Sequence, residues 1–128
     1  MKRTFAATLI LLLLFGAAAQ ASVDVNAPID IMVNNSYIKA DVNPFLISGS
    51  TYVPIRFIGE ALGAEVSWDD FAATAAISAD ETIITLPIGK NNAFINDKAV
   101  SIEHGILLVN DRTFAPARFI CEALGAAV

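Results

Sequence analysis

The pattern of apolar and polar positions in residues 51–66 (TYVPIRFIGEALGAEV) predicts a strand followed by a short helix. Thr-Tyr-Val is a β-type run, and Pro54 suits the first turn of a helix, where its missing N–H costs nothing. The helix would present one apolar stripe, formed by Ile55, Ile58 and Leu62. Gly63 can adopt the left-handed conformation that closes a helix. We therefore expect a helix from about Pro54 to Leu62.

The same pattern returns 62 positions later, in residues 113–128 (TFAPARFICEALGAAV). The two stretches align without a gap and are identical at eleven of sixteen positions. Self-similarity at a fixed offset indicates a structural unit that is used more than once. The sequence therefore predicts a first unit over residues 30–92 and a second over residues 93–128.

Short apolar runs between turn residues predict antiparallel hairpins in both units. Ile31–Val33 and Ser36–Ile38 flank two asparagines, and Ala93–Ile95 and Lys98–Val100 flank Asn96-Asp97; such turn pairs tolerate positive φ. Further strands are expected at Phe45–Ile47, Thr51–Val53, Val66–Trp68, Thr74–Ser78, Thr82–Leu86, Leu107–Val109 and Thr113–Ala115. The predicted fold class is α+β, with antiparallel hairpins and one short helix in each of two tandem related units, the second truncated. The stretch from Pro87 to Asn92 is not rich in serine or glycine, so we expect the units to pack together.

The second unit stops at Val128, where the first continues with a strand, a turn and another strand over residues 66–78. A helix without this covering hairpin would expose an apolar face. Two interpretations follow. Either the sequence is a fragment of a longer chain with a fused domain beyond Val128, or a second copy completes the unit in a homodimer.

The N-terminus has the three parts of a secretory signal peptide. Lys2-Arg3 is followed by an apolar run over residues 5–15, and Ala19-Gln20-Ala21 has the small-x-small form of a cleavage site. The run is short for a membrane span, although an uncleaved anchor is the alternative interpretation. We expect residues 1–21 to be removed, residues 22–29 to form an exposed lead-in, and no membrane span to remain.

Removal of the leader changes the charge. The mature chain would keep six basic and thirteen acidic side chains, a formal net charge of −7. This balance argues against nucleic acid and anionic membrane surfaces as partners.

The helix ending EALGAEV, followed by SWD, resembles the copper amine oxidase N-terminal domain-like family, also called the stalk domain. The resemblance covers most of residues 30–128. This family is common in secreted proteins of Gram-positive bacteria. In the amine oxidases the domain is a stalk remote from the copper and the quinone cofactor. The resemblance therefore implies a non-catalytic spacer or attachment domain at the cell envelope, without a cofactor. Its partner would be a wall or envelope component, or a fused module.

The residues themselves offer little for catalysis. His104 is the only histidine and Cys121 the only cysteine, whereas a metal site usually needs three or four ligands. Cys121 stands where the first unit has Gly59, and we expect it to be a small buried side chain; an intermolecular disulfide is the alternative. Asp69-Asp70 and Asp80-Glu81 lie in predicted turns, where carboxylates are usually solvated. We therefore predict no enzyme activity, metal or cofactor.

A candidate ligand surface comprises Tyr52, Trp68, Arg56 and Arg118. The two arginines repeat between the units and could bind a carboxylate or sulfate group on a wall polymer. The simpler interpretation pairs each arginine with the glutamate four residues later in its own helix. The two aromatic rings could stack on sugars. A module that binds cell-wall glycan or peptide is thus the alternative function, beside an accessory part of a wall hydrolase.

Overall fold

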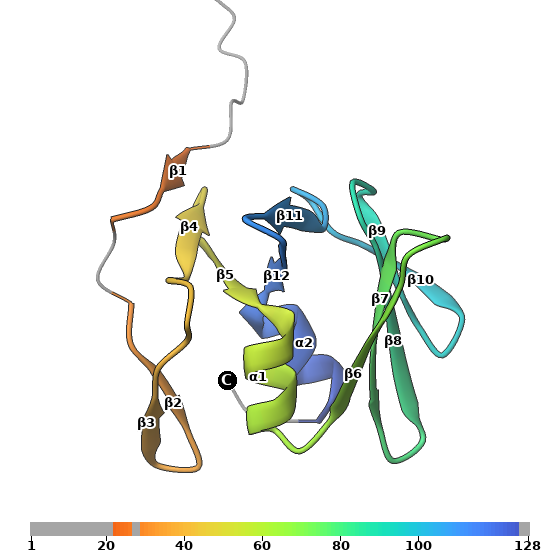
Figure 1. The fold of residues 1–128 in the computed structure, drawn as a ribbon, viewed down its shortest axis with the longest axis horizontal. Coiled ribbons are helices and arrows are strands. Elements are labelled where there is room, and N and C mark those ends of the chain that lie inside the picture. The colour runs from red at the N-terminus through yellow and green to blue at the C-terminus, as the bar shows by residue number, and fades with distance from the viewer. Residues whose placement is uncertain (1–21, 27–28, 126–128) are drawn as a thin grey trace, which may run out of the picture.

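The computed structural model describes residues 22–26 and 29–125. It contains two five-stranded sheets, a separate hairpin and two short helices, and all of the paired strands are antiparallel (Figure 1). The first sheet has the order β1 (Val23–Asp24), β4 (Phe45–Ile47), β5 (Ser50–Pro54), β12 (Arg112–Pro116) and β11 (Leu107–Val109). The second has the order β10 (Lys98–Ser101), β9 (Asn92–Ile95), β8 (Thr82–Pro87), β7 (Thr74–Ala79) and β6 (Glu65–Asp69). The hairpin is formed by β2 (Ile31–Val33) and β3 (Ser36–Ile38), and the helices are α1 (Ile55–Ala61) and α2 (Ala117–Ala123). The expected α+β class is confirmed.

The centre of the first sheet is the pair of strands that precede the helices. Val53 in β5 is the register partner of Ala115 in β12, which lies 62 positions later in the chain. On either side, Tyr52 faces Pro116 and Pro54 faces Phe114. Phe114 lies 62 positions after Tyr52, and Pro116 lies 62 positions after Pro54, so the two flanking pairs are equivalent. Residues at the same place in the two similar stretches therefore meet around a local two-fold axis between Val53 and Ala115.

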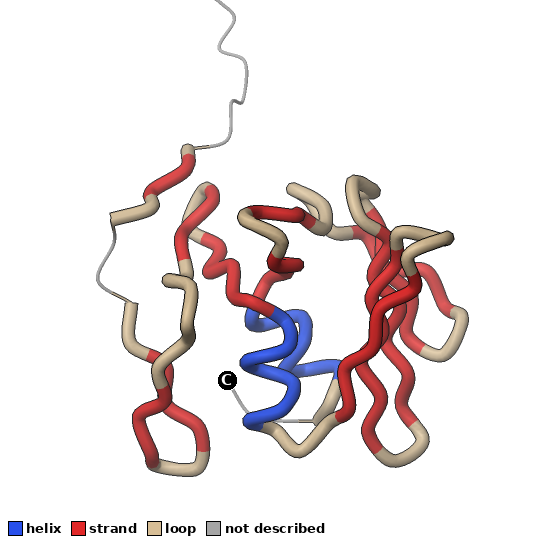
Figure 2. The backbone as a smooth tube through the Cα atoms, in the orientation of Figure 1, coloured by secondary structure: helices blue, strands red, loops and turns tan. Residues whose placement is uncertain are grey.

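Each helix starts directly from its strand at a proline. Pro54 and Pro116 both have a φ of −62°, with extended ψ values of 126° and 129°. Because this ψ is not helical, each proline is the last residue of its strand and the N-cap of its helix. Helix α1 therefore runs from Ile55 to Ala61, slightly shorter than the span expected from the sequence. The two helices lie between the second sheet and the hairpin in Figure 2, where helices are blue and strands red.

The second sheet covers α1 with its apolar face. The fully buried side chains of this core include Val53, Ile77, Ile84, Leu86, Ile106 and Ile120. Gly59 lies so close to β6 that a Cβ atom there would be 2.8 Å from Cγ2 of Val66. The pairing of β8 with β9, in which Ile84 faces Ile95, joins the two stretches of chain without a linker. The expectation that they pack together is confirmed.

Strand β1 was not predicted from the sequence. Val23 pairs with Ile47 and Asp24 with Leu46, so the expected lead-in adds a short strand to the edge of the first sheet. The free main-chain groups of an edge strand readily accept such an addition. The predicted signal peptide (residues 1–21) and the last three residues of the second stretch lie outside the described residues. Neither described helix is long and apolar enough to cross a membrane.

Candidate functional site

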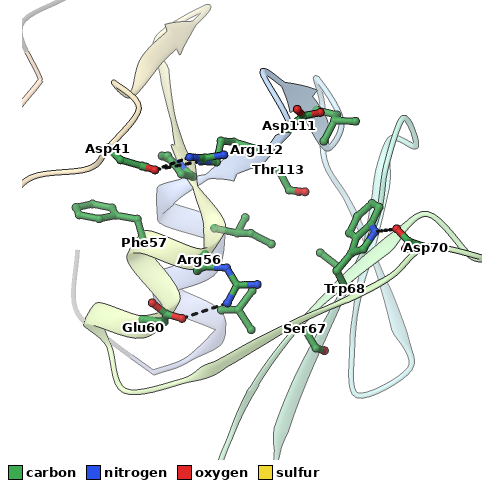
Figure 3. A pocket seen from close by; sticks show the side chains of 15 residues that line it. Asp41, Arg56, Phe57, Glu60, Ser67, Trp68, Asp70, Asp111, Arg112 and Thr113 are labelled. Carbon is green, nitrogen blue, oxygen red and sulfur yellow. Dashed lines mark hydrogen bonds and ion pairs between the residues drawn. The ribbon is translucent and has the colours of Figure 1, made fainter.

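A groove of about 740 Å³ lies between α1, strand β6 and the turn that joins β11 to β12. Helix α1 contributes Arg56, Phe57 and Glu60 to its lining, β6 contributes Trp68, and the β11–β12 region contributes Arg112. Figure 3 shows Trp68 on the side of the groove opposite α1. Asp41, from the loop before β4, also lines the groove, which thus brings together residues that lie far apart in the chain.

Both arginines of the groove form ion pairs with carboxylates. Nη1 of Arg56 lies 3.3 Å from Oε2 of Glu60. Nη2 and Nε of Arg112 donate to the same oxygen, Oδ2 of Asp41, over 2.6 and 3.2 Å. This contact holds the pKa of the Asp41 carboxyl below its ordinary value and raises the pKa of Arg112. A hydrogen bond between charged groups stabilises the charged form of each.

The charge balance of the groove is acidic. Its lining includes two arginines and four carboxylates, namely Asp41, Glu60, Asp70 and Asp111. With each arginine beside its own carboxylate, the remaining negative charge comes from Asp70 and Asp111. Such a lining favours a cationic or neutral ligand over the anionic one that the repeated arginines suggested.

Trp68 is a large aromatic residue of the groove that water can reach. Its side chain is 42% exposed, and its indole N–H donates to Oδ1 of Asp70 two residues later. The hydrogen bond fixes the orientation of the ring, and an exposed ring held in this way can stack on an apolar face of a ligand.

Of the four candidate ligand residues, the groove contains Arg56 and Trp68 but not Arg118 or Tyr52. Arg118 lies on α2, and its Nη1 is 3.5 Å from Oε2 of Glu122. The simpler interpretation of the repeated Arg and Glu residues, an ion pair within each helix, is therefore confirmed. Whether any of these residues binds a ligand stays a prediction.

Tyr52 lies in the core, not on a surface. Only 1% of it is exposed, and its ring stacks on Phe45 with centroids 5.8 Å apart. Its hydroxyl donates to the carbonyl oxygen of Gly105 over 2.9 Å. Burial, with a smaller contribution from the charge of Glu103, raises the pKa of Tyr52 to about 12.

Sequence reasoning missed the ion pair between Asp41 and Arg112. These residues are 71 positions apart, so no local spacing could connect them. The sequence places Arg112 directly after Asn110-Asp111, and this position suggested that Arg112 belongs to the turn. In the structure Arg112 is instead the first residue of β12.

The two side chains considered for chemistry lie in ordinary surroundings. His104 is half-buried, with Nε2 3.8 Å from Oε2 of Glu103. Cys121 is a half-buried free thiol. Its burial, followed by the nearby charge of Glu122, raises its pKa, which lowers the fraction of reactive thiolate at neutral pH. Among residues 22–26 and 29–125, no group of three or more His, Cys, Asp and Glu could hold a metal ion.

A comparison with known families matches residues 32–128 to the copper amine oxidase N-terminal domain. The chain belongs to this family. The match extends from β2 to the end of the sequence and therefore includes the groove and both helices. The copper amine oxidase N-terminal domain is non-catalytic, which fits a stalk or accessory role. A comparison with curated proteins found no match.

Proposed function

We propose that this chain is a secreted, non-catalytic stalk or spacer domain of the bacterial cell envelope, accessory to a fused or partner module. The observation that carries the proposal is the family match, which includes most of the chain. The charged start, apolar run and Ala19-Gln20-Ala21 of the leader support export. A Gram-positive wall is the proposed setting.

We also propose that the domain consists of two tandem related units. Two observations support this architecture. Eleven of sixteen positions are identical between residues 51–66 and 113–128, and residues 62 positions apart meet across β5 and β12. Because each of the two sheets contains strands from both units, we expect the domain to be stiff, as a spacer needs to be.

Expression of the complete sequence in a Gram-positive host tests the proposed location. We expect a protein that begins at Ser22 in the medium or wall fraction, identified by N-terminal sequencing and intact mass. A control variant with Leu11→Arg and Leu13→Arg in the apolar run should stay inside the cell. Protein that starts at Met1 in the cytoplasm of cells carrying the unaltered sequence would contradict the proposal. Hydrolysis of purified wall by the mature chain would contradict the non-catalytic role.

A second function, binding of a wall glycan or peptide, is favoured by the exposed indole in an acidic groove. Amine-bearing peptides or amino sugars match this combination of charge and ring. Sedimentation of the mature protein with purified cell wall tests the idea. Stacking on an aromatic ring contributes about 1 kcal/mol, so Trp68→Ala should weaken binding about fivefold.

Phe71→Ala is the matched control for this experiment. Phe71 is a fully exposed aromatic residue in the neighbouring turn and is not part of the groove lining. We expect this variant to bind wall like the unaltered protein. Equal losses in the two variants would indicate general stickiness of aromatic residues, and no loss in either would remove the groove as a binding site.

A further inference from the structure

Strand β6 is the longest edge strand of the two five-stranded sheets. It has five residues, whereas the other edge strands β1, β11 and β10 have two, three and four. Four of the five residues of β6 are exposed. In the part of the chain that the structure describes, β6 pairs with β7 and with no strand on its other side. Its sequence has neither proline nor lysine, two residue types that commonly protect such an edge.

The main-chain groups of Val66 and Trp68 point away from β7, toward the free edge. The partner of Thr74 in β8 is Pro87, which has no N–H. Thr74 therefore directs its own N–H and C=O to its other partner, Asp69 of β6. The direction alternates along an antiparallel strand, so the groups of Asp69 point to β7 and those of Val66 and Trp68 point outward. Each of these two residues thus offers one N–H and one C=O to an additional strand.

The groove lies along this edge. Three successive residues of β6, Val66, Ser67 and Trp68, belong to its lining. Successive side chains of a strand point to opposite faces, so contact with all three places the groove beside the strand, where the main chain is accessible. In Figure 3, Ser67 and Trp68 lie across the groove from Arg56 and Glu60 of α1. The volume of about 740 Å³ falls in the range of about 300–1,000 Å³ that is common for ligand sites.

The charges around the edge select a cationic side chain. Arg56 and Arg112 each form an ion pair with a carboxylate, so Asp70 and Asp111 supply the remaining negative charge of the lining. Asp70 accepts the hydrogen bond from the indole N–H of Trp68, which holds a carboxylate next to an exposed aromatic ring. A lysine or arginine side chain opposite Trp68 would contact the ring face and the carboxylate together.

We propose that the free edge of β6 binds an extended peptide as an additional antiparallel strand, with a lysine or arginine side chain of the peptide beside Trp68 and Asp70. The main chain of the peptide pairs with Val66 and Trp68, and the peptide residue between the two paired ones lies opposite Ser67. This role of the edge depends on the binding function proposed for the groove. It specifies a peptide rather than an amino sugar, because a sugar has no main chain to pair with the strand.

A second copy of the chain is a poorer occupant of the edge. Two β6 strands that paired through both Val66 and Trp68 would cross at Ser67 of each copy. In this antiparallel register, Glu65 of one copy would face Asp69 of the other. Like charges directly opposite each other destabilise a sheet, and the formal net charge of −7 on each mature chain adds to the repulsion. Charge therefore favours a cationic peptide over another β6 strand.

The first experiment titrates the mature protein with the peptide acetyl-Thr-Lys-Thr-Ala-Thr-amide. Its lysine is designed to face Trp68 and its alanine to face Val66, while the threonines favour an extended chain. Trp68 is the only tryptophan, so its fluorescence reports binding at the edge itself. We expect a saturable change at millimolar peptide, and about fivefold weaker binding of a peptide with glutamate in place of lysine. Equal affinities for the two peptides would overturn the proposed selection by charge.

Methylation of single peptide nitrogens tests whether the peptide pairs as a strand. The N–H of the lysine would bond to β6, whereas the N–H of the threonine after it would point to solvent. A methyl group on the lysine nitrogen should therefore weaken binding about tenfold or more, and one on that threonine nitrogen should have little effect. The two methylated peptides have the same composition and charge. Equal losses in both would show that β6 does not recognise the main chain, and would overturn the proposal.

Hydrogen exchange of the β6 amides locates the added strand. Saturating peptide should slow the exchange of Val66 and Trp68, whose N–H groups point outward, much more than that of Ser67, which already bonds to β7. Unchanged exchange at Val66 and Trp68 would place the peptide elsewhere and overturn the proposal. Slow exchange of these two amides without peptide, accompanied by a dimer in sedimentation equilibrium, would assign the edge to a second copy instead.

These results are separable from the wall-binding experiment. Protein that sediments with wall but shows no fluorescence change with the peptide would keep the wall-binding function and overturn the added strand. Peptide binding with the expected methylation pattern, but without sedimentation on wall, would support the added strand and show that the wall is not the source of the peptide.

Discussion

At the scale of single residues, Tyr52 makes a contact that connects distant parts of the chain. Its hydroxyl reaches the carbonyl oxygen of Gly105, 53 positions later, inside the core of the first sheet. A buried carbonyl that loses its only donor costs about 1–2 kcal/mol. We expect Tyr52→Phe to lower the free energy of unfolding by about that amount at pH 7, as measured by urea denaturation.

The same residue predicts a pH dependence. The pKa of Tyr52 is about 12 in the folded protein, above its ordinary value of 10.0. The folded state therefore holds this proton more tightly than the unfolded chain. Its contribution to stability is complete below pH 10 and is lost as the pH rises toward 12. Urea midpoints should therefore fall less steeply in this pH range for Tyr52→Phe than for the unaltered protein.

Tyr37→Phe is the matched control, because Tyr37 is 74% exposed. Its removal should leave the alkaline slope unchanged. An equal flattening in both variants would mean that burial of Tyr52 does not cause the effect.

Residue roles could be predicted where they depend on short spacing. The pairs Arg56–Glu60 and Arg118–Glu122 follow from two residues that are one helical turn apart. Tyr52 was assigned to a surface because a β-type run indicates a strand but not how deeply it lies. Tyr52, Val53 and Pro54 are all buried, so the second half of β5 has no exposed face from which an alternating pattern could arise.

At the scale of elements, the contact between α1 and β6 depends on the missing side chain of Gly59. A Cβ atom at this position would lie 2.8 Å from Cγ2 of Val66 and 3.5 Å from Cγ2 of Ile77. Alanine gains about 1 kcal/mol over glycine within a helix, while overpacking of a core costs about 1–3 kcal/mol. We expect Gly59→Ala to reduce the free energy of unfolding by about 1 kcal/mol, measured by urea denaturation.

The double variant Gly59→Ala with Val66→Ala tests the reason for this loss. The smaller side chain at position 66 should make room for the new methyl group, so the two losses should not add. Cys121→Ala serves as the comparison on α2 and should change stability by less than about 1 kcal/mol. A stabilising effect of Gly59→Ala alone would show that the helix and the sheet are farther apart than the structure indicates.

Elements were predicted best where turn chemistry marks both ends. The asparagine turns fixed β2 and β3 to the residue, because only a few residue types accept two successive positive φ values. The strands β4 and β11 were also placed correctly. Strand β1 has only two residues, which is too short for a periodic pattern, and it exists because the edge of β4 is available.

At the scale of the whole molecule, each sheet takes strands from both stretches of the chain. β5 pairs with β12 across the centre of the first sheet, and β8 pairs with β9 in the second. The sequence predicted packed units, but the strand order could not be read from it. Many of the strands have similar apolar patterns, so the sequence does not show which strands pair. The pairing depends on the helices that each sheet must cover.

This shared construction predicts that neither half folds alone. A fragment of residues 22–92 would keep β5 without β12 and β8 without β9, leaving two central strands with one unpaired edge each. We expect this fragment to lack a cooperative urea transition, as followed by the fluorescence of Trp68, the only tryptophan. The mature chain should unfold in one transition, with coincident fluorescence and far-UV circular dichroism.

Mixing the fragment with residues 93–128 provides the decisive comparison. If the pairings β5–β12 and β8–β9 complete the two sheets, the mixture should regain far-UV signal that the sum of the separate fragments lacks. Val53→Pro removes the N–H of the residue that faces Ala115, and should abolish this recovery. Cooperative folding of residues 22–92 alone would instead show that the units are independent. A spacer of independent units would bend between them, whereas one that shares two sheets moves as a single body.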